Sequence, residues 1–303
     1  MKLQKNYLLR MTLIVAVLLC FHRSQAQDII QIEPLFEYPV APEELPSLSE
    51  KSDYLVNHFW DNFDFKNKEA VNQIALNDAF KVYASPLRWA NINVANQGIE
   101  KLIASLSGNP TLMLQFTNAA EEALYGPRAD FWIDEIYLKF LDASLKNKKI
   151  PDNRKSKLKL RADILKASKI GETAPSFKFE NQQGIEQQYF PMTTPSILIF
   201  ADPEDMDWRL LRLRLETNSV LNHTVEKGKL NILFIVPIER EGWEGAVSNY
   251  PAKWVIGNSP TIGKQLDIRL LPSAYLVGSD GKIVMKNVSP ETAINAALAL
   301  MQD

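Results

Sequence analysis

The spacing of apolar residues changes at Gly171, and this change limits the folds open to the chain. Before it, apolar side chains recur at steps of three and four, as within 99–106, which is the period of one helix face. After it, short continuous apolar runs alternate with helical segments. The runs 196–200 and 231–236 have the composition of buried strands. A helical region followed by a mixed α/β region is therefore expected.

We expect these regions to be two domains, a helical domain over 51–167 and an α/β domain over 168–303. A chain of 303 residues suits two domains of ordinary size. Residues 27–50 hold four prolines among acidic residues and are predicted to form an extended leader. The predicted fold class is α+β overall, with an all-α N-terminal domain before a mixed sheet flanked by helices.

The second domain ends in a predicted hairpin and helix. Strand-like runs at 273–277 and 282–286 flank the turn residues 278–281. An amphipathic pattern over 290–301 predicts the closing helix. The expected order of elements in this domain is β, β, α, β, α, β, β, α.

Residues 1–26 have the features of a secretory signal peptide. Lys2, Lys5 and Arg10 form a basic segment, and the apolar stretch 11–21 is shorter than a bilayer-spanning helix requires. Small residues at 24–26 provide a cleavage site. We expect export to the periplasm or cell envelope, or secretion, without a stable membrane span after cleavage. An uncleaved membrane anchor is the alternative.

The cysteine content excludes several chemistries. The chain has one cysteine, Cys20, so removal of the signal peptide leaves no thiol and no disulfide. The formal net charge of −2 gives no general attraction to nucleic acid or anionic lipid. The basic segment 146–169 is interpreted as a solvated helix and linker, with an anion-binding surface as the alternative. No nucleic-acid partner is predicted.

An acidic loop over 202–208 joins the strand 196–200 to a helix-like segment. Asp202 is a good N-cap and Pro203 suits the first helical position, so a helix is predicted to begin there. The loop carboxylates would be stabilised near the positive end of that helix. They are also hard oxygen donors, but the loop lacks the glycine turn and spacing of a calcium site. We predict no metal and no cofactor, with a cation site or a remodelled binding groove as alternatives.

Histidines and tryptophans add little to these predictions. Two histidines lie beyond the signal peptide, and their spacing is not that of metal ligands. His58 is interpreted as a packed core residue. Core packing is the expected role of the tryptophans, with exposure around a groove as the alternative.

Three motifs in the second region together resemble the thioredoxin-like superfamily, in its exported branch of peroxiredoxin-like and thiol–disulfide proteins. The segment 170–177, Ile-Gly-Glu-Thr-Ala-Pro-Ser-Phe, is similar to that branch's opening motif Gly-x-x-Ala-Pro-x-Phe. The segment 271–273, Leu-Pro-Ser, matches the loop whose proline is cis, and 280–282, Asp-Gly-Lys, matches the last hairpin turn. The helical region, through 53–65 and 126–137, is similar to an uncharacterised domain that precedes thioredoxin-like domains in exported proteins of Gram-negative bacteria.

The resemblance places the two redox cysteine positions at Asp205 and Trp208. Thiol–disulfide exchange needs one sulfur to attack and another to leave, so neither oxidoreductase nor peroxidase activity is expected. Thioredoxin-like folds also bind extended chains beside the cis-proline, and that capacity does not need cysteine. The predicted function is therefore a non-enzymatic, protein- or peptide-binding module of the cell envelope. Its candidate groove is formed by Asp202, Met206, Trp208, Leu271, Pro272 and Ser273. The alternatives are a hydrolase or metal-dependent enzyme built on Asp202–Asp207, and a purely structural spacer.

Overall fold

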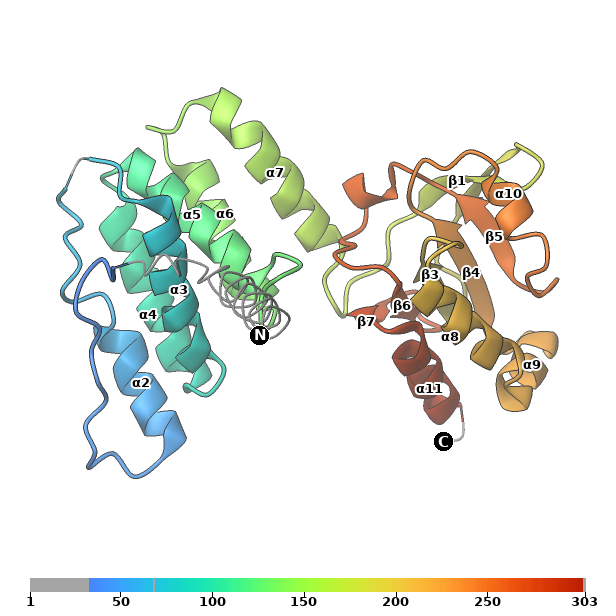
Figure 1. The fold of residues 1–303 in the computed structure, drawn as a ribbon, viewed down its shortest axis with the longest axis horizontal. Coiled ribbons are helices and arrows are strands. Elements are labelled where there is room, and N and C mark those ends of the chain that lie inside the picture. Colours follow the sequence, from blue (N-terminus) through green and yellow to red (C-terminus); the bar gives the residue numbers. More distant parts are fainter. Residues whose placement is uncertain (1–32, 68, 302–303) are drawn as a thin grey trace, which may run out of the picture.

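The computed structural model describes residues 33–67 and 69–301, in which a helical half and a sheet-containing half lie side by side (Figure 1). This arrangement confirms the predicted fold class. The predictions made for residues 1–26, including the signal peptide and Cys20, lie outside the described residues. Within those residues, no helix is both long and apolar enough to cross a membrane.

The first half is a bundle of helices around an aromatic core. Its helices are α2 (Leu48–His58), α3 (Gln73–Leu87), α4 (Ile92–Leu106), α5 (Pro110–Leu124), α6 (Asp134–Lys146) and α7 (Asp152–Ala167). Ser47 and Glu50 form a capping box at the start of α2, and asparagine side chains cap the next three helices. Rings such as Trp60 and Phe116, 4.9 Å apart, fill the interior.

The leader preceding α2 packs against this bundle. Leu35, Phe36 and Tyr38 are partly buried on the helical core. The ring centroid of Phe36 lies 5.6 Å from that of Phe59, an edge-to-face contact that aromatic pairs favour. Residues 33–47 are therefore a non-helical segment that adds apolar contacts to the bundle, whereas residues 48–50, predicted as the end of the leader, belong to α2.

The second half is a seven-stranded sheet in the order β2-β1-β5-β4-β3-β6-β7. Its strands are β1 (Phe177–Asn181), β2 (Glu186–Tyr189), β3 (Ser196–Phe200), β4 (Asn231–Val236), β5 (Val255–Asn258), β6 (Ser273–Val277) and β7 (Ile283–Val288). The central strands β3 and β4 are parallel, whereas β6 is antiparallel to β3. β3 and β4 are buried along most of their length, as their apolar composition predicted.

One face of the sheet is covered by helices, which share a single hydrophobic cluster with it. These are α8 (Met206–Glu216), α9 (Ser219–Glu226), α10 (Trp243–Ala246) and α11 (Pro290–Leu300). Figure 1 shows α8, α9 and α11 together on this side of the strands. The opposite face has its own cluster, which includes Phe177, Phe200, Tyr275 and, from the short 3₁₀ helix η1 (Ile262–Lys264), Ile262.

Two strands were missing from the predicted order, β2 and β5. β2 has the sequence Glu-Gln-Gln-Tyr and three exposed side chains, so it lacks the apolar alternation that marks a strand. β5 has only four residues and contains Gly257, a residue that is depleted in strands. Backbone pairing creates both: β2 pairs with β1 in a hairpin, and β5 pairs with β1 and β4, which are distant in sequence.

The interpretation of His58 as a packed core residue was wrong. Its side chain is exposed, with Nδ1 lying 2.8 Å from Oδ2 of Asp61. Its neighbour Phe59 is 2% exposed because successive residues on a helix differ in direction by about 100°. An apolar neighbour in sequence therefore does not place a helical residue in the core.

We predict that Gly257→Ala destabilises the second half by roughly 1–3 kcal/mol, the usual cost of overpacking. A Cβ at this position would lie 2.1 Å from Cδ2 of Phe179 and 3.0 Å from the carbonyl oxygen of Glu180. Urea denaturation checks the free energy of unfolding. Gly263→Ala is the matched control, since a Cβ there meets nothing within 4 Å. Equal stability of the two variants would contradict the prediction.

Candidate functional site

The acidic loop after β3 is ordered by its own side chains. Oδ1 of Asp202 accepts a hydrogen bond from the backbone N–H of Glu204 at 3.0 Å. Oδ1 of Asp205 accepts from the N–H of Trp208 at 2.9 Å and caps α8, which begins at Met206. The predicted cap at Asp202 was therefore wrong, because Asp202 closes the preceding turn instead. Asp205 fills the N-cap position with a carboxylate.

The carboxylates of Asp202 and Glu204 both form ion pairs with Arg240, which lies between β4 and α10. This guanidinium takes up the charge that a bound cation would otherwise neutralise. Among residues 33–67 and 69–301, no group of three or more histidine, cysteine, aspartate or glutamate side chains is arranged to hold a metal ion. The loop geometry accordingly supports a structural role for these carboxylates.

Trp208, which the resemblance places at the second cysteine position, lies in the core beneath the sheet. Its side chain is 0% exposed. The ring stacks on Phe234 with centroids 5.0 Å apart, and Nε1 donates to the hydroxyl of Tyr250 at 2.8 Å. The indole therefore stabilises α8 against the sheet. Trp243 and Trp254 are also buried in this cluster.

The Pro272 loop lies beside the acidic loop, as the resemblance implied. Strand pairing sets Phe200, the last residue of β3, opposite Ser273, the first residue of β6. The segment leaving β3 and the segment entering β6 are therefore neighbours at one edge of the sheet. The Leu271–Pro272 peptide bond is cis.

The predicted groove residues divide into surface and interior positions. Met206 and Leu271 are 63% and 40% exposed, and Asp202 and Pro272 are half-buried. Ser273 is buried, and its hydroxyl lies 3.5 Å from Oδ1 of Asn287. A ligand at this edge would meet the surface residues, whereas Trp208 and Ser273 support them from inside.

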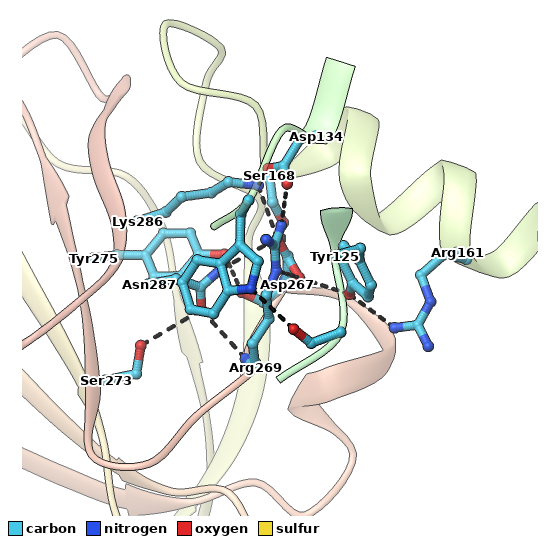
Figure 2. A network of polar contacts seen from close by, with 12 residues as sticks. Tyr125, Asp134, Arg161, Ser168, Asp267, Arg269, Ser273, Tyr275, Lys286 and Asn287 are labelled. Atoms are coloured by element: carbon cyan, nitrogen blue, oxygen red, sulfur yellow. Dashed lines mark hydrogen bonds and ion pairs between the residues drawn. The ribbon is translucent and has the colours of Figure 1, made fainter. Parts of the chain in front are cut away.

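The loop before Pro272 carries a buried polar network that joins the two halves of the chain (Figure 2). At its centre is Asp267, whose side chain is 0% exposed. Its two oxygens accept from Arg269 Nη2 at 2.6 Å, Lys286 Nζ at 2.8 Å and the hydroxyl of Tyr125 at 2.7 Å. Tyr125 follows α5, so this last bond crosses between the halves.

Further contacts of the same network also cross the interface. Asp134, at the start of α6, pairs with Arg269 and with Lys286, whose Nζ lies 2.6 Å from Oδ2. The guanidinium of Arg269 lies over the rings of Tyr125 and Trp132, at 4.2 and 4.7 Å from their centroids. Two cations thus lie between two carboxylates and two aromatic faces, so each buried charge has a partner.

The network holds Asp267 ionised. Burial by itself raises the pKa of this carboxyl, but the hydrogen bond from Arg269 and the charge of Lys286 outweigh burial and lower the pKa below its usual value. The backbone N–H of Asp267 donates to Ser168 Oγ at 2.9 Å, and its carbonyl accepts from Tyr275 at 2.6 Å. The loop that ends at Pro272 is thereby fixed at both backbone and side chain.

The sequence reasoning did not identify this network. Asp267 and Arg269 are two residues apart, and their partners at 125, 134 and 286 belong to separate elements. No local motif marks such a cluster. A cavity of about 380 Å³ lies beside it, lined by Trp132, Leu138, Leu165 and Lys286 among others.

We predict that Asp267→Asn lowers the free energy of unfolding by about 3–5 kcal/mol, the usual cost of breaking a buried ion pair. The variant leaves Arg269 and Lys286 with only one carboxylate to share. Urea denaturation followed by tryptophan fluorescence measures the change. Lys178→Ala is the control, because the Lys178–Glu186 pair is exposed and should change stability by less than about 1 kcal/mol.

The same comparison predicts a pH dependence. A carboxyl whose pKa is lowered by folding stabilises the native state above its unfolded pKa of about 3.9, and the contribution is lost as pH falls through the folded pKa. The stability difference between wild type and Asp267→Asn should therefore be constant above about pH 5 and narrow below about pH 4. A difference independent of pH down to denaturation would contradict an ionised Asp267.

Comparisons with known proteins agree with this architecture. Residues 21–168 match the family model described as a domain of unknown function, DUF5106. A crystal structure of a thioredoxin-like protein from Bacteroides caccae is similar to the chain with a TM-score of 0.69 and 20% identity. The similarity covers 88% of this chain and 99% of that one, so it includes both halves. No match was found among curated proteins.

Two further solved structures are similar to part of the chain. One is a conserved protein of unknown function from Bacteroides fragilis, with 25% identity, a TM-score of 0.40 and coverage of 43% of this chain and 98% of that one. The other is the thioredoxin domain of a thiol-disulfide oxidoreductase from Bacteroides vulgatus, with 18% identity, a TM-score of 0.37 and coverage of 44% and 97%. The chain therefore has a thioredoxin-like fold, preceded by a helical region that matches DUF5106.

Proposed function

We propose that this chain is an exported, redox-inactive thioredoxin-like protein that binds an extended segment of a partner protein. The binding edge is the one where the acidic loop after β3 meets the Pro272 loop. The observation that carries the proposal is the pairing of Phe200 with Ser273, which keeps both loops adjacent although neither cysteine position holds a sulfur. Export to the cell envelope rests on the signal-peptide features of residues 1–26.

The loss of redox chemistry follows from the residues in the two cysteine positions. Asp205 is an N-cap, and its carboxylate cannot replace a thiolate in disulfide exchange. Trp208 is a buried core residue. Cys20 is the single cysteine of the chain and would leave with a cleaved signal peptide. The mature chain would then depend on its partner for any sulfur.

The binding role is supported by the apolar surface at this edge. Met206 and Leu271 are exposed, and so are Leu210, one helical turn along α8, and Leu270, with 53% and 48% of each side chain accessible. Exposed apolar side chains suit an extended peptide, because contacts with alternate peptide side chains give specificity. The network around Asp267 holds the Pro272 loop in place before binding, which lowers the entropic cost of association.

The enzymatic alternative lacks a comparable observation. A hydrolase or metal-dependent enzyme built on the acidic loop would need carboxylates free to act on substrate. Asp202 and Glu204 are paired with Arg240, and Asp205 caps α8. The binding module is therefore the function that the geometry supports best.

Redox inactivity is tested with insulin and dithiothreitol. The chain lacking residues 1–26 should give no acceleration of insulin reduction above the uncatalysed rate, because no protein thiolate is present to attack a disulfide. A thioredoxin with an intact Cys-x-x-Cys pair serves as the positive control. Acceleration by the chain would contradict redox inactivity.

Peptide binding is tested with a displayed library of unstructured peptides, followed by fluorescence anisotropy on the selected sequences. Met206→Asp and Leu271→Asp should each weaken binding at least tenfold, since losing one apolar contact costs about 1.5–3 kcal/mol. Leu300→Asp is the matched control, because Leu300 is a 62% exposed apolar residue on α11. Equal affinities in all three variants, or failure to select any binding peptide from the library, would contradict binding at this edge.

A further inference from the structure

The sheet opens at the hairpin formed by β1 and β2. β1 pairs with β5 at only two positions, Glu180 with Asn258 and Asn181 with Gly257. The rest of the hairpin therefore diverges from the central strands. A cavity of about 350 Å³ lies between the hairpin and β3, β4 and β5. This cavity is close to the N-terminal ends of β3 and β4, whereas the proposed peptide edge is at the end of β3.

The walls of this cavity are mainly apolar. Phe179 and Tyr189 contribute from the hairpin, and Leu233 contributes from β4. At the opening, Phe190, Met192 and Val255 are 56%, 45% and 44% exposed. An apolar interior with an accessible apolar opening is the usual form of a small-molecule site.

A row of polar side chains crosses one end of the cavity. Strand pairing places Ser196 opposite Asn231, and Leu233 opposite Val255. Lys253 lies in the turn before β5, two residues before Val255. All three polar residues line the cavity. The strand residues Ser196 and Asn231 also share the face of Leu233, because side chains alternate along a strand.

Ser196 Oγ donates to the carbonyl oxygen of Thr194 at 3.2 Å, but the other polar groups of this cavity have weak protein partners or none in the part of the chain that the structure describes. The hydroxyl of Tyr189 is buried and has no hydrogen-bond partner among the described residues. Nδ2 of Asn231 has Sδ of Met192 at 3.9 Å as its side-chain partner, which is a weak contact. Within the described residues, Lys253 forms no ion pair. The lining contains no aspartate or glutamate.

An unpartnered buried hydroxyl destabilises the empty protein. Burial raises the pKa of Tyr189 to about 12, although the nearby Ser196 hydroxyl partly opposes this shift, so the group stays a neutral donor at physiological pH. Donors from Tyr189, Asn231 and Lys253, with no opposing acidic side chain, favour an anionic acceptor. The planar or branched surfaces of Phe179 and Leu233 favour an apolar body.

We infer that this cavity binds a small amphipathic carboxylate, with its apolar body against Phe179 and Leu233 and its carboxylate toward Asn231 and Lys253. The site is independent of the peptide edge and of the two cysteine positions. The protein would thus have a second, small-molecule function at the opposite end of the strands.

Isothermal titration calorimetry on the full chain tests the carboxylate. The probes are 4-phenylbutyrate, octanoate and the neutral 4-phenyl-1-butanol. Both carboxylates should bind at least tenfold more tightly than the alcohol, and their order distinguishes a ring from an alkyl chain as the preferred body. Lys253→Ala should reduce this preference about fivefold or more, whereas Lys227→Ala, outside the cavity, should not. Equal binding of carboxylate and alcohol, or no binding of either carboxylate, would overturn the inference.

Two further variants locate the site. Val255→Trp should fill the opening and abolish binding, and Val284→Trp, at a 38% exposed strand residue outside the cavity lining, should leave it intact. Tyr189→Phe should raise the melting temperature of the empty protein and weaken 4-phenylbutyrate binding. A Tyr189→Phe variant with altered stability but unchanged 4-phenylbutyrate binding would contradict a role for the Tyr189 hydroxyl in binding. Unchanged binding in Val255→Trp, with a native circular dichroism spectrum, would exclude this cavity.

Discussion

The buried carboxylate of Asp267 fixes how the rest of the structure is arranged. It accepts hydrogen bonds from Arg269, Lys286 and Tyr125, and Tyr125 belongs to the helical half. Arg269 in turn pairs with Asp134 at the start of α6. Because a buried charge is tolerated only with its partners in place, one orientation of the two halves satisfies the network. The helical region therefore helps to hold the edge of the thioredoxin-like sheet.

The same network links the interface between the two halves to the loop that ends at Pro272. Ser168 and Tyr275 bind the backbone of Asp267, so the loop is held at both its side chain and its main chain. A binding edge held in this way loses little conformational freedom when it meets a partner. This gives the helical half a physical role in the proposed function even though it contributes no residue to the acidic loop or to the Pro272 loop.

Ordinary interactions hold the local structure at Asp205 and Trp208, the two positions to which the resemblance assigns cysteines. Asp205 supplies the acceptor that the first N–H groups of α8 need, and Trp208 fills the core under the sheet. Asp205 stabilises the local structure as a cap, and Trp208 does so as a stacked ring. The fold therefore does not depend on redox chemistry at this place.

Part of this structure could be read from the sequence. Continuous apolar runs predicted β3 and β4, and the resemblance correctly implied a cis bond before Pro272. β2 and the cap at Asp205 were missed, and His58 was misplaced. Each of these depends on which face or neighbour a residue meets. Local pattern does not specify that when the segment is short or polar.

By itself, the sequence determined that a helical region precedes an α/β region and that the described chain has no sulfur for redox exchange. Both follow from local periodicity and residue identity. Tertiary structure alone decided the partners of Asp267 and the row formed by Ser196, Asn231 and Lys253. These groups come from elements far apart in sequence, and only the packing of strands and helices brings them together.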